Sequence, residues 1–62
     1  MTQGDIIDGL KELGADSPEN GVFPSELINF FPMMNKSSVY RCLRDCKKNR
    51  RIKAAGRKIY LS

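Results

Sequence analysis

Glycine and proline divide this chain of 62 residues into short segments, and that division constrains its fold more than any other feature. The longest segment without either residue runs from position 33 to 55, whereas the first half is interrupted repeatedly. Short segments cannot bury an apolar face alone, so they must pack against one another. We expect one domain over residues 1–62 with a thin core, because a chain of this size buries only about 60% of its unfolded surface.

Apolar residues at helical spacing predict a first helix over residues 3–13. Thr2 and Asp5 form a capping pair at its start, and Gly14 supplies its stop. Turn-forming residues fill positions 14–21, which we expect to be a surface connection. The exposed side of this helix is acidic, which has two interpretations: solubility, or a surface for a second copy in a homodimer.

A second, shorter helix is predicted before Pro32, which ends it. Val22-Phe23 is expected to form a very short strand, and Ser25 is a favourable N-cap for the helix that follows. The aromatic residues of this region lie beside aliphatic ones, and we expect them in the core rather than on a binding surface. They are Phe23, Phe30 and Phe31.

The third helix, over residues 36–48, has the clearest pattern. Asn35 is its expected cap, and Asn49 is expected in the left-handed conformation that ends it. Its apolar residues recur at i, i+3, i+4 and i+7; they are Val39, Cys42, Leu43 and Cys46. Residues 52–54 and 58–61 then predict a hairpin with its turn at Gly56. The fold class is therefore α+β, mostly α, with three helices before a C-terminal two-stranded β-hairpin.

Both cysteines are expected to be reduced and buried, because side chains four residues apart on a helix do not meet with disulfide geometry. The chain has no histidine, and two thiols are too few for a closed zinc site, so we expect no metal and no other cofactor. No catalytic constellation or phosphate-binding glycine loop is recognisable, which excludes an enzyme from our interpretation. There is no signal peptide or long apolar run, which favours an intracellular protein that does not enter a membrane.

Charge is segregated along the chain. Residues 1–31 carry six acids and one base, whereas residues 32–62 carry ten bases and one acid. The halves therefore have formal charges of −5 and +9, which sum to the net charge of +4. Such segregation concentrates the positive field on the second half, and nucleic acid is the first polyanion to consider.

The third helix carries the chemistry expected of a DNA-reading element. The positions opposite its apolar stripe are Ser37, Arg41, Arg44 and Lys48. Arginine can bridge the two acceptors of guanine, serine can contact a base edge or a phosphate, and free N–H groups at a helix start favour a phosphate. The candidate DNA-binding residues are Asn35, Lys36, Ser37, Ser38, Tyr40, Arg41, Arg44, Lys48, Arg51, Lys53, Arg57 and Lys58.

This order of elements resembles the winged helix-turn-helix family. The resemblance rests on Ser25-Glu-Leu-Ile, on Asn35-Lys-Ser-Ser-Val-Tyr-Arg-Cys-Leu43 and on Gly56-Arg-Lys-Ile-Tyr-Leu61. It implies that residues 36–48 are a recognition helix for the major groove and that residues 54–58 are a wing. It also implies a sequence-specific double-stranded DNA-binding protein, a small prokaryotic or viral transcriptional regulator that is cytoplasmic and nucleoid-associated.

Two alternatives stay open. One is a winged-helix protein-interaction module whose basic face docks an acidic partner. The other is the subset of the family that binds left-handed duplexes with an asparagine and a tyrosine on the third helix and a tryptophan in the wing; Asn35 and Tyr40 resemble the first two, and the chain has no tryptophan. Two roles stay open for Tyr60: packing against the core, or contact with a partner. No small-molecule substrate is evident.

Overall fold

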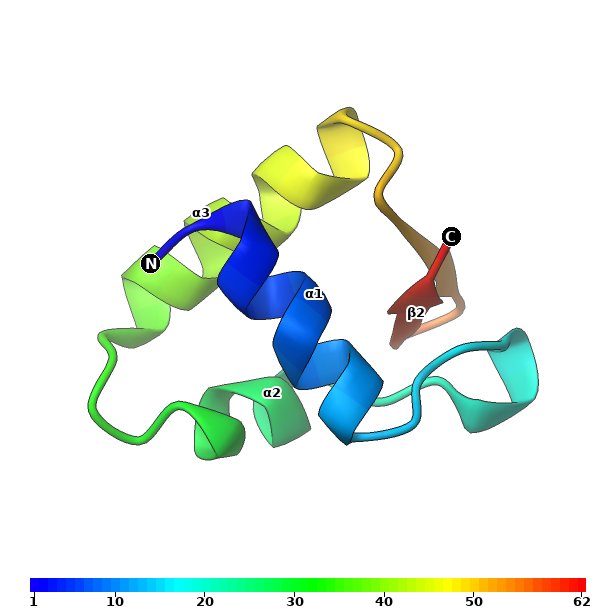
Figure 1. Ribbon diagram of the computed structural model, residues 1–62, viewed down its shortest axis with the longest axis horizontal. Coiled ribbons are helices and arrows are strands. Elements are labelled where there is room, and N and C mark those ends of the chain that lie inside the picture. Colours follow the sequence, from blue (N-terminus) through cyan, green and yellow to red (C-terminus); the bar gives the residue numbers. More distant parts are fainter.

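Three helices precede a C-terminal β-hairpin, as the periodicity predicts (Figure 1). The computed structural model describes all of residues 1–62. Its elements are α1 (Gln3–Glu12), a 3₁₀ turn η1 (Pro18–Asn20), α2 (Pro24–Phe30), α3 (Lys36–Lys48), β1 (Ile52–Ala55) and β2 (Lys58–Leu61). Helix α1 packs against both α2 and α3, and it also contacts β2. No helix has the length and apolar character needed to cross a bilayer.

The helix starts follow local capping chemistry, with one correction. The Thr2 hydroxyl accepts from the Asp5 N–H, and the Asp5 carboxylate accepts from the Thr2 N–H, which completes the predicted pair. Ser25 is not the cap of α2, however. The helix begins one residue earlier at Pro24, whose fixed φ suits the first helical position, and Glu26 accepts from the Phe23 N–H at 2.8 Å.

The two longer helices end in the same hydrogen-bonding motif. At the end of α1, Gly14 has a φ of 72°, and the next N–H donates to the Leu10 carbonyl at 2.9 Å. At the end of α3, Arg50 has a φ of 59°, and the Arg51 N–H donates to the Cys46 carbonyl at 2.9 Å. The expectation that Asn49 takes the left-handed position is wrong, because this motif places that conformation one residue later.

The hairpin belongs to a slightly larger sheet. Strands β1 and β2 pair in antiparallel register, and the two-residue turn between them begins with Gly56 at a φ of 64°. On the other edge of β2, Val22 exchanges both backbone hydrogen bonds with Ile59, at 2.9 and 2.8 Å. The very short strand predicted near Val22-Phe23 is therefore a single bridge, and it connects the acidic half of the chain to the wing-like hairpin.

The core is small and draws on all three α-helices and both strands. Its eleven buried residues are Ile6, Leu10, Ala15, Val22, Leu27, Val39, Cys42, Leu43, Cys46, Ile52 and Ile59. Both cysteines are free and buried, as predicted. The expectation of three core phenylalanines is wrong for two of them, since Phe23 is 44% and Phe30 41% exposed. Their segment is too short and too near the surface to bury them, and only Phe31 packs against the core.

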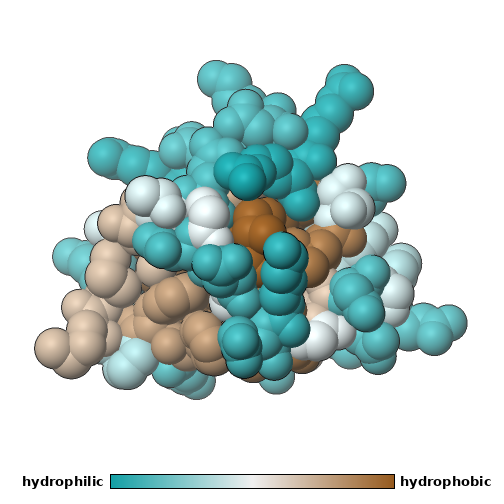
Figure 2. All heavy atoms as spheres, viewed as in Figure 1, coloured by the Kyte–Doolittle hydropathy of each residue, from teal (hydrophilic) through white to brown (hydrophobic).

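An apolar surface lies where α2 turns into α3. Met33 is 94% exposed in this turn, and Phe30 meets Phe31 edge to face with ring centroids 5.1 Å apart. Figure 2 shows apolar atoms gathered there, at the lower left of the molecule. A smaller and more strongly hydrophobic patch is visible near the centre, and hydrophilic side chains cover most of the remaining view.

Candidate nucleic-acid interface

An open hollow of about 480 Å³ lies between α3, the start of α2 and the hairpin. Helix α3 contributes Tyr40 and Lys47 to its lining, α2 contributes Ser25, and the hairpin turn contributes Arg57. Phe23 lies at the same hollow, and the ammonium group of Lys58 sits 5.5 Å from the centroid of its ring. Cationic, hydroxyl and aromatic groups from three elements therefore meet around one concave surface.

Helical spacing extends this surface along α3. Tyr40, Arg44 and Lys47 are related by i, i+4 and i+7, so they share the side of the helix that faces the hairpin. Lys36 and Ser37 precede Tyr40 by four and three residues and continue the same stripe. All five side chains are exposed. We call this set, together with Arg57, the hairpin-side face.

The predicted candidates do not all lie on the hairpin-side face. Ser38 and Arg41 line a different hollow, which they share with Asp45 of α3 and with Thr2 and Gln3 at the start of α1. Lys48 is seven residues beyond Arg41 and four beyond Arg44, so it lies between this stripe and the hairpin-side face. The acidic Asp45 interrupts this second stripe, so its potential is less positive than that of the hairpin-side face.

Arg51 is held in a structural contact. Its guanidinium donates to the Gln3 side-chain oxygen at 3.3 Å, and the Asn49 amide donates to the same oxygen at 3.1 Å. These bonds join the end of α3 to the start of α1. Arg51 also lines a third hollow with Lys11 and Arg50, on the α1 side of the molecule. Arg51 is therefore separated from the hairpin-side face.

The remaining hairpin candidates lie on its exposed surface. Lys53 pairs with Tyr60 across the antiparallel ladder, so both project from the same side of the sheet. Tyr60 is half-buried and packs against the core, which favours the packing interpretation that the sequence left open. Lys58 begins β2 and is exposed beside Phe23.

The start of α3 is closed by its own cap. The Asn35 side-chain oxygen accepts from the Ser37 N–H at 3.0 Å, as predicted. The side-chain oxygen of Asn35 is thus engaged within the helix, whereas the Ser37 hydroxyl makes no hydrogen bond within the chain. Of the two, Ser37 is better placed to contact a ligand.

The two cysteine thiols of α3 are buried on the side of the helix away from the hairpin-side face, and burial disfavours their ionisation. Burial raises the pKa of Cys42 above its ordinary value of 9.0, and burial is also the largest cause that raises the pKa of Cys46 to about 11. Both side chains are protonated at neutral pH and pack in the core. They pack as small apolar groups, and the Cys46 thiol also donates a weak hydrogen bond to the Gln3 carbonyl at 3.9 Å, which links α3 to α1.

Sequence reasoning did not select three residues that line this hollow: Lys47, Ser25 and Phe23. The spacing of Lys47 from Tyr40 was a signal for the first, but Ser25 was assigned to a cap and Phe23 to the core. Comparison with protein-family models, with curated proteins and with solved structures gives no match to this chain. The case for function therefore rests on the geometry and charge described above.

Proposed function

We propose that the protein is a sequence-specific double-stranded DNA-binding protein of the winged helix-turn-helix type and acts as a transcriptional regulator. In this proposal α3 enters the major groove, and the β1–β2 hairpin is a wing against the backbone or the adjacent minor groove. The observation that carries the proposal is the convergence of Tyr40, Lys47, Ser25 and Arg57 from three elements at one hollow. A helix fits the major groove, and cations from neighbouring elements fit the phosphates on either side of it.

Roles follow from position. Arg44 lies in the middle of α3 on the hairpin-side face, where a guanidinium can bridge the two acceptors of a guanine. Lys47 and Arg57 flank the hollow between helix and wing, where the backbone of one strand would pass, and they suit phosphate contacts. Lys53 and Lys58 add positive charge along the wing. The acidic side chains of α1 would be repelled by a duplex and belong on the face turned away from it.

Selection of bound sequences from a random duplex pool tests this proposal. We expect one motif to be enriched, and its affinity to fall steeply with rising salt because phosphate contacts release counterions. A pool that stays random would refute sequence-specific reading. Binding to an acidic polypeptide with no binding to any duplex would replace the proposal by the alternative, a module that docks an acidic protein partner.

A further inference from the structure

Two aromatic side chains at the hollow are exposed, although the small core would gain stability by burying them. Phe23 is 44% and Tyr40 50% exposed, although the protein has few large apolar side chains to bury. The one aromatic ring pair in the structure, Phe30 with Phe31, lies outside this hollow. The Tyr40 ring makes no aromatic or cation–π contact within the chain, so it is available to a ligand. The Lys58 ammonium lies over the Phe23 ring, 5.5 Å from its centroid, so a base that stacks on that face of Phe23 replaces the lysine.

The open hollow is large enough to receive one nucleotide. Its volume of about 480 Å³ falls within the range of roughly 300–1,000 Å³ found for small-molecule pockets. The Ser25 hydroxyl can hydrogen-bond a base edge, and the Lys47 and Arg57 cations can hold the flanking phosphates. Aromatic rings within a positively charged groove are the combination that binds unpaired nucleotides, because every base has a face that stacks.

We propose that this hollow receives an unpaired nucleobase, which stacks on Tyr40 and Phe23 while its phosphates contact Lys47 and Arg57. The inference rests on the nucleic-acid function proposed above and adds to it a ligand that a fully paired duplex does not present. A strand that crosses from the groove occupied by α3 to the wing passes this hollow, so a base extruded from that strand could enter it. Phosphate contacts alone would require the cations but neither ring.

The fluorescence of Tyr40 can report stacking directly. It has two tyrosines and no tryptophan, so Tyr60→Phe leaves Tyr40 as the only source of tyrosine emission. This variant is titrated with three probes: a paired duplex, a single-stranded oligothymidylate and an abasic oligomer of the same length and charge. We expect the oligothymidylate to quench Tyr40 and to bind at least about fivefold tighter than the abasic oligomer.

The outcomes separate this inference from the proposed function. If the duplex binds while oligothymidylate binds no better than the abasic oligomer and leaves Tyr40 emission unchanged, the inference is wrong and the duplex function stands. If oligothymidylate binds and quenches while no duplex binds, the inference stands and the duplex function fails. If none of the three probes binds, both fail.

Substitutions provide a second test with a matched control. Phe23→Ala and Tyr40→Ala should each reduce the preference for oligothymidylate over the abasic oligomer severalfold, whereas Tyr40→Phe should retain it. Phe30→Ala removes a ring of similar exposure, 41%, outside the hollow and should leave the preference unchanged. Circular dichroism verifies that each variant is folded. An equal loss in Phe30→Ala and Phe23→Ala would overturn the inference.

Discussion

Replacing Arg50 with glycine should stabilise the protein. Arg50 holds a φ of 59° at the end of α3, in the motif where α1 uses Gly14. The left-handed conformation costs a residue with a Cβ about 1–2 kcal/mol. Glycine avoids that cost but loses about 0.5–1 kcal/mol more conformational freedom on folding. The expected net gain for Arg50→Gly is about 0.5–1 kcal/mol, or a rise in Tm of roughly 2–8 °C for a chain of this length.

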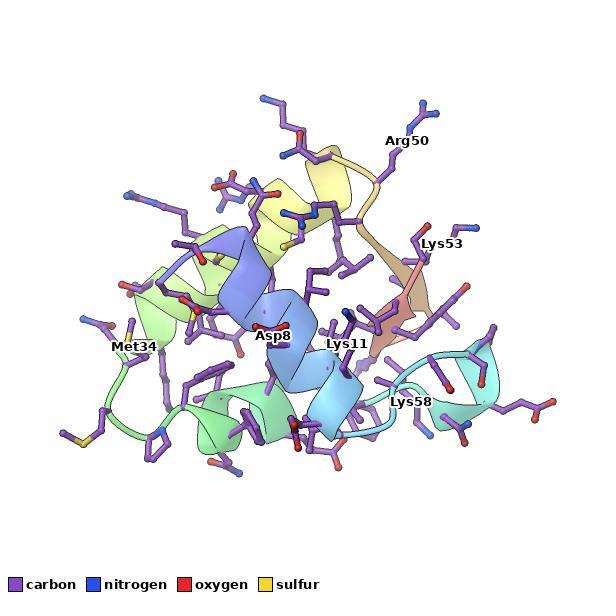
Figure 3. All side chains as sticks on the ribbon, in the orientation of Figure 1. Asp8, Lys11, Met34, Arg50, Lys53 and Lys58 are labelled. Atoms are coloured by element: carbon purple, nitrogen blue, oxygen red, sulfur yellow. The ribbon has the colours of Figure 1, made fainter.

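Arg50→Ala is the matched control. The side chain of Arg50 extends away from the body of the molecule in Figure 3, and both substitutions remove its charge. Alanine keeps the Cβ and should therefore give no comparable gain. Thermal unfolding followed by circular dichroism measures the difference. If Arg50→Gly melts no higher than Arg50→Ala, the Cβ at this position carries no strain and the reasoning is refuted.

Three further predictions concern α3. Asn35→Ala should cost about 1 kcal/mol of unfolding free energy in denaturant titration, because it removes the acceptor for the Ser37 N–H; an unchanged midpoint would show that this cap is dispensable. Unfolded thiols ionise near pH 9.0, whereas folded Cys46 keeps its proton until its pKa of about 11. The free energy of unfolding should therefore fall as the pH rises from 9 to 11, and it should fall less in Cys46→Ala than in wild type. Parallel profiles for the two proteins would contradict this. Arg44→Ala should weaken binding to the selected DNA site by about 1–3 kcal/mol, measured by fluorescence anisotropy. Arg41→Ala should weaken it less, because Arg41 faces the start of α1. Equal losses would contradict the division of α3 into two faces.

Local signals made most of the fold predictable. The bounds of α3 were confirmed at both ends because a long apolar stripe, a cap and the absence of glycine and proline agree there. The hairpin was confirmed because Gly56 supplies the positive φ that its turn requires. Helix α1 ends one residue before its predicted limit, at Glu12, because Leu13 is its C-cap.

The two main errors have different physical origins, one in local capping geometry and one in tertiary packing. The intrinsic preference of asparagine for left-handed backbone favoured Asn49, but the bond from the Arg51 N–H to the Cys46 carbonyl requires that conformation at Arg50. Phe23 was assigned to the core because apolar residues usually pack, yet it is 44% exposed and only the Lys58 side chain of β2 lies over its ring.

The candidate site was predictable in composition and less so in arrangement. A helical wheel locates the side opposite the core, but it does not say which neighbour lies beside each flank. That information separates Arg41 and Ser38, which face the start of α1, from Lys47, which faces the hairpin. Arg51 remains a predicted phosphate contact, and nothing in the sequence indicated that its guanidinium also donates to the Gln3 side chain.

The most direct test of the account compares two charge-matched double variants. Lys47→Gln with Arg57→Gln removes one lysine and one arginine from the hairpin-side face, and Lys11→Gln with Arg50→Gln removes the same charges from the α1 side. Affinity for the selected duplex is measured across a salt series. The account predicts that the first pair flattens the slope of log K against log[salt] by nearly two units while the second leaves it close to wild type. Equal flattening by both pairs, or none by the first, would contradict the assignment of the DNA-binding surface.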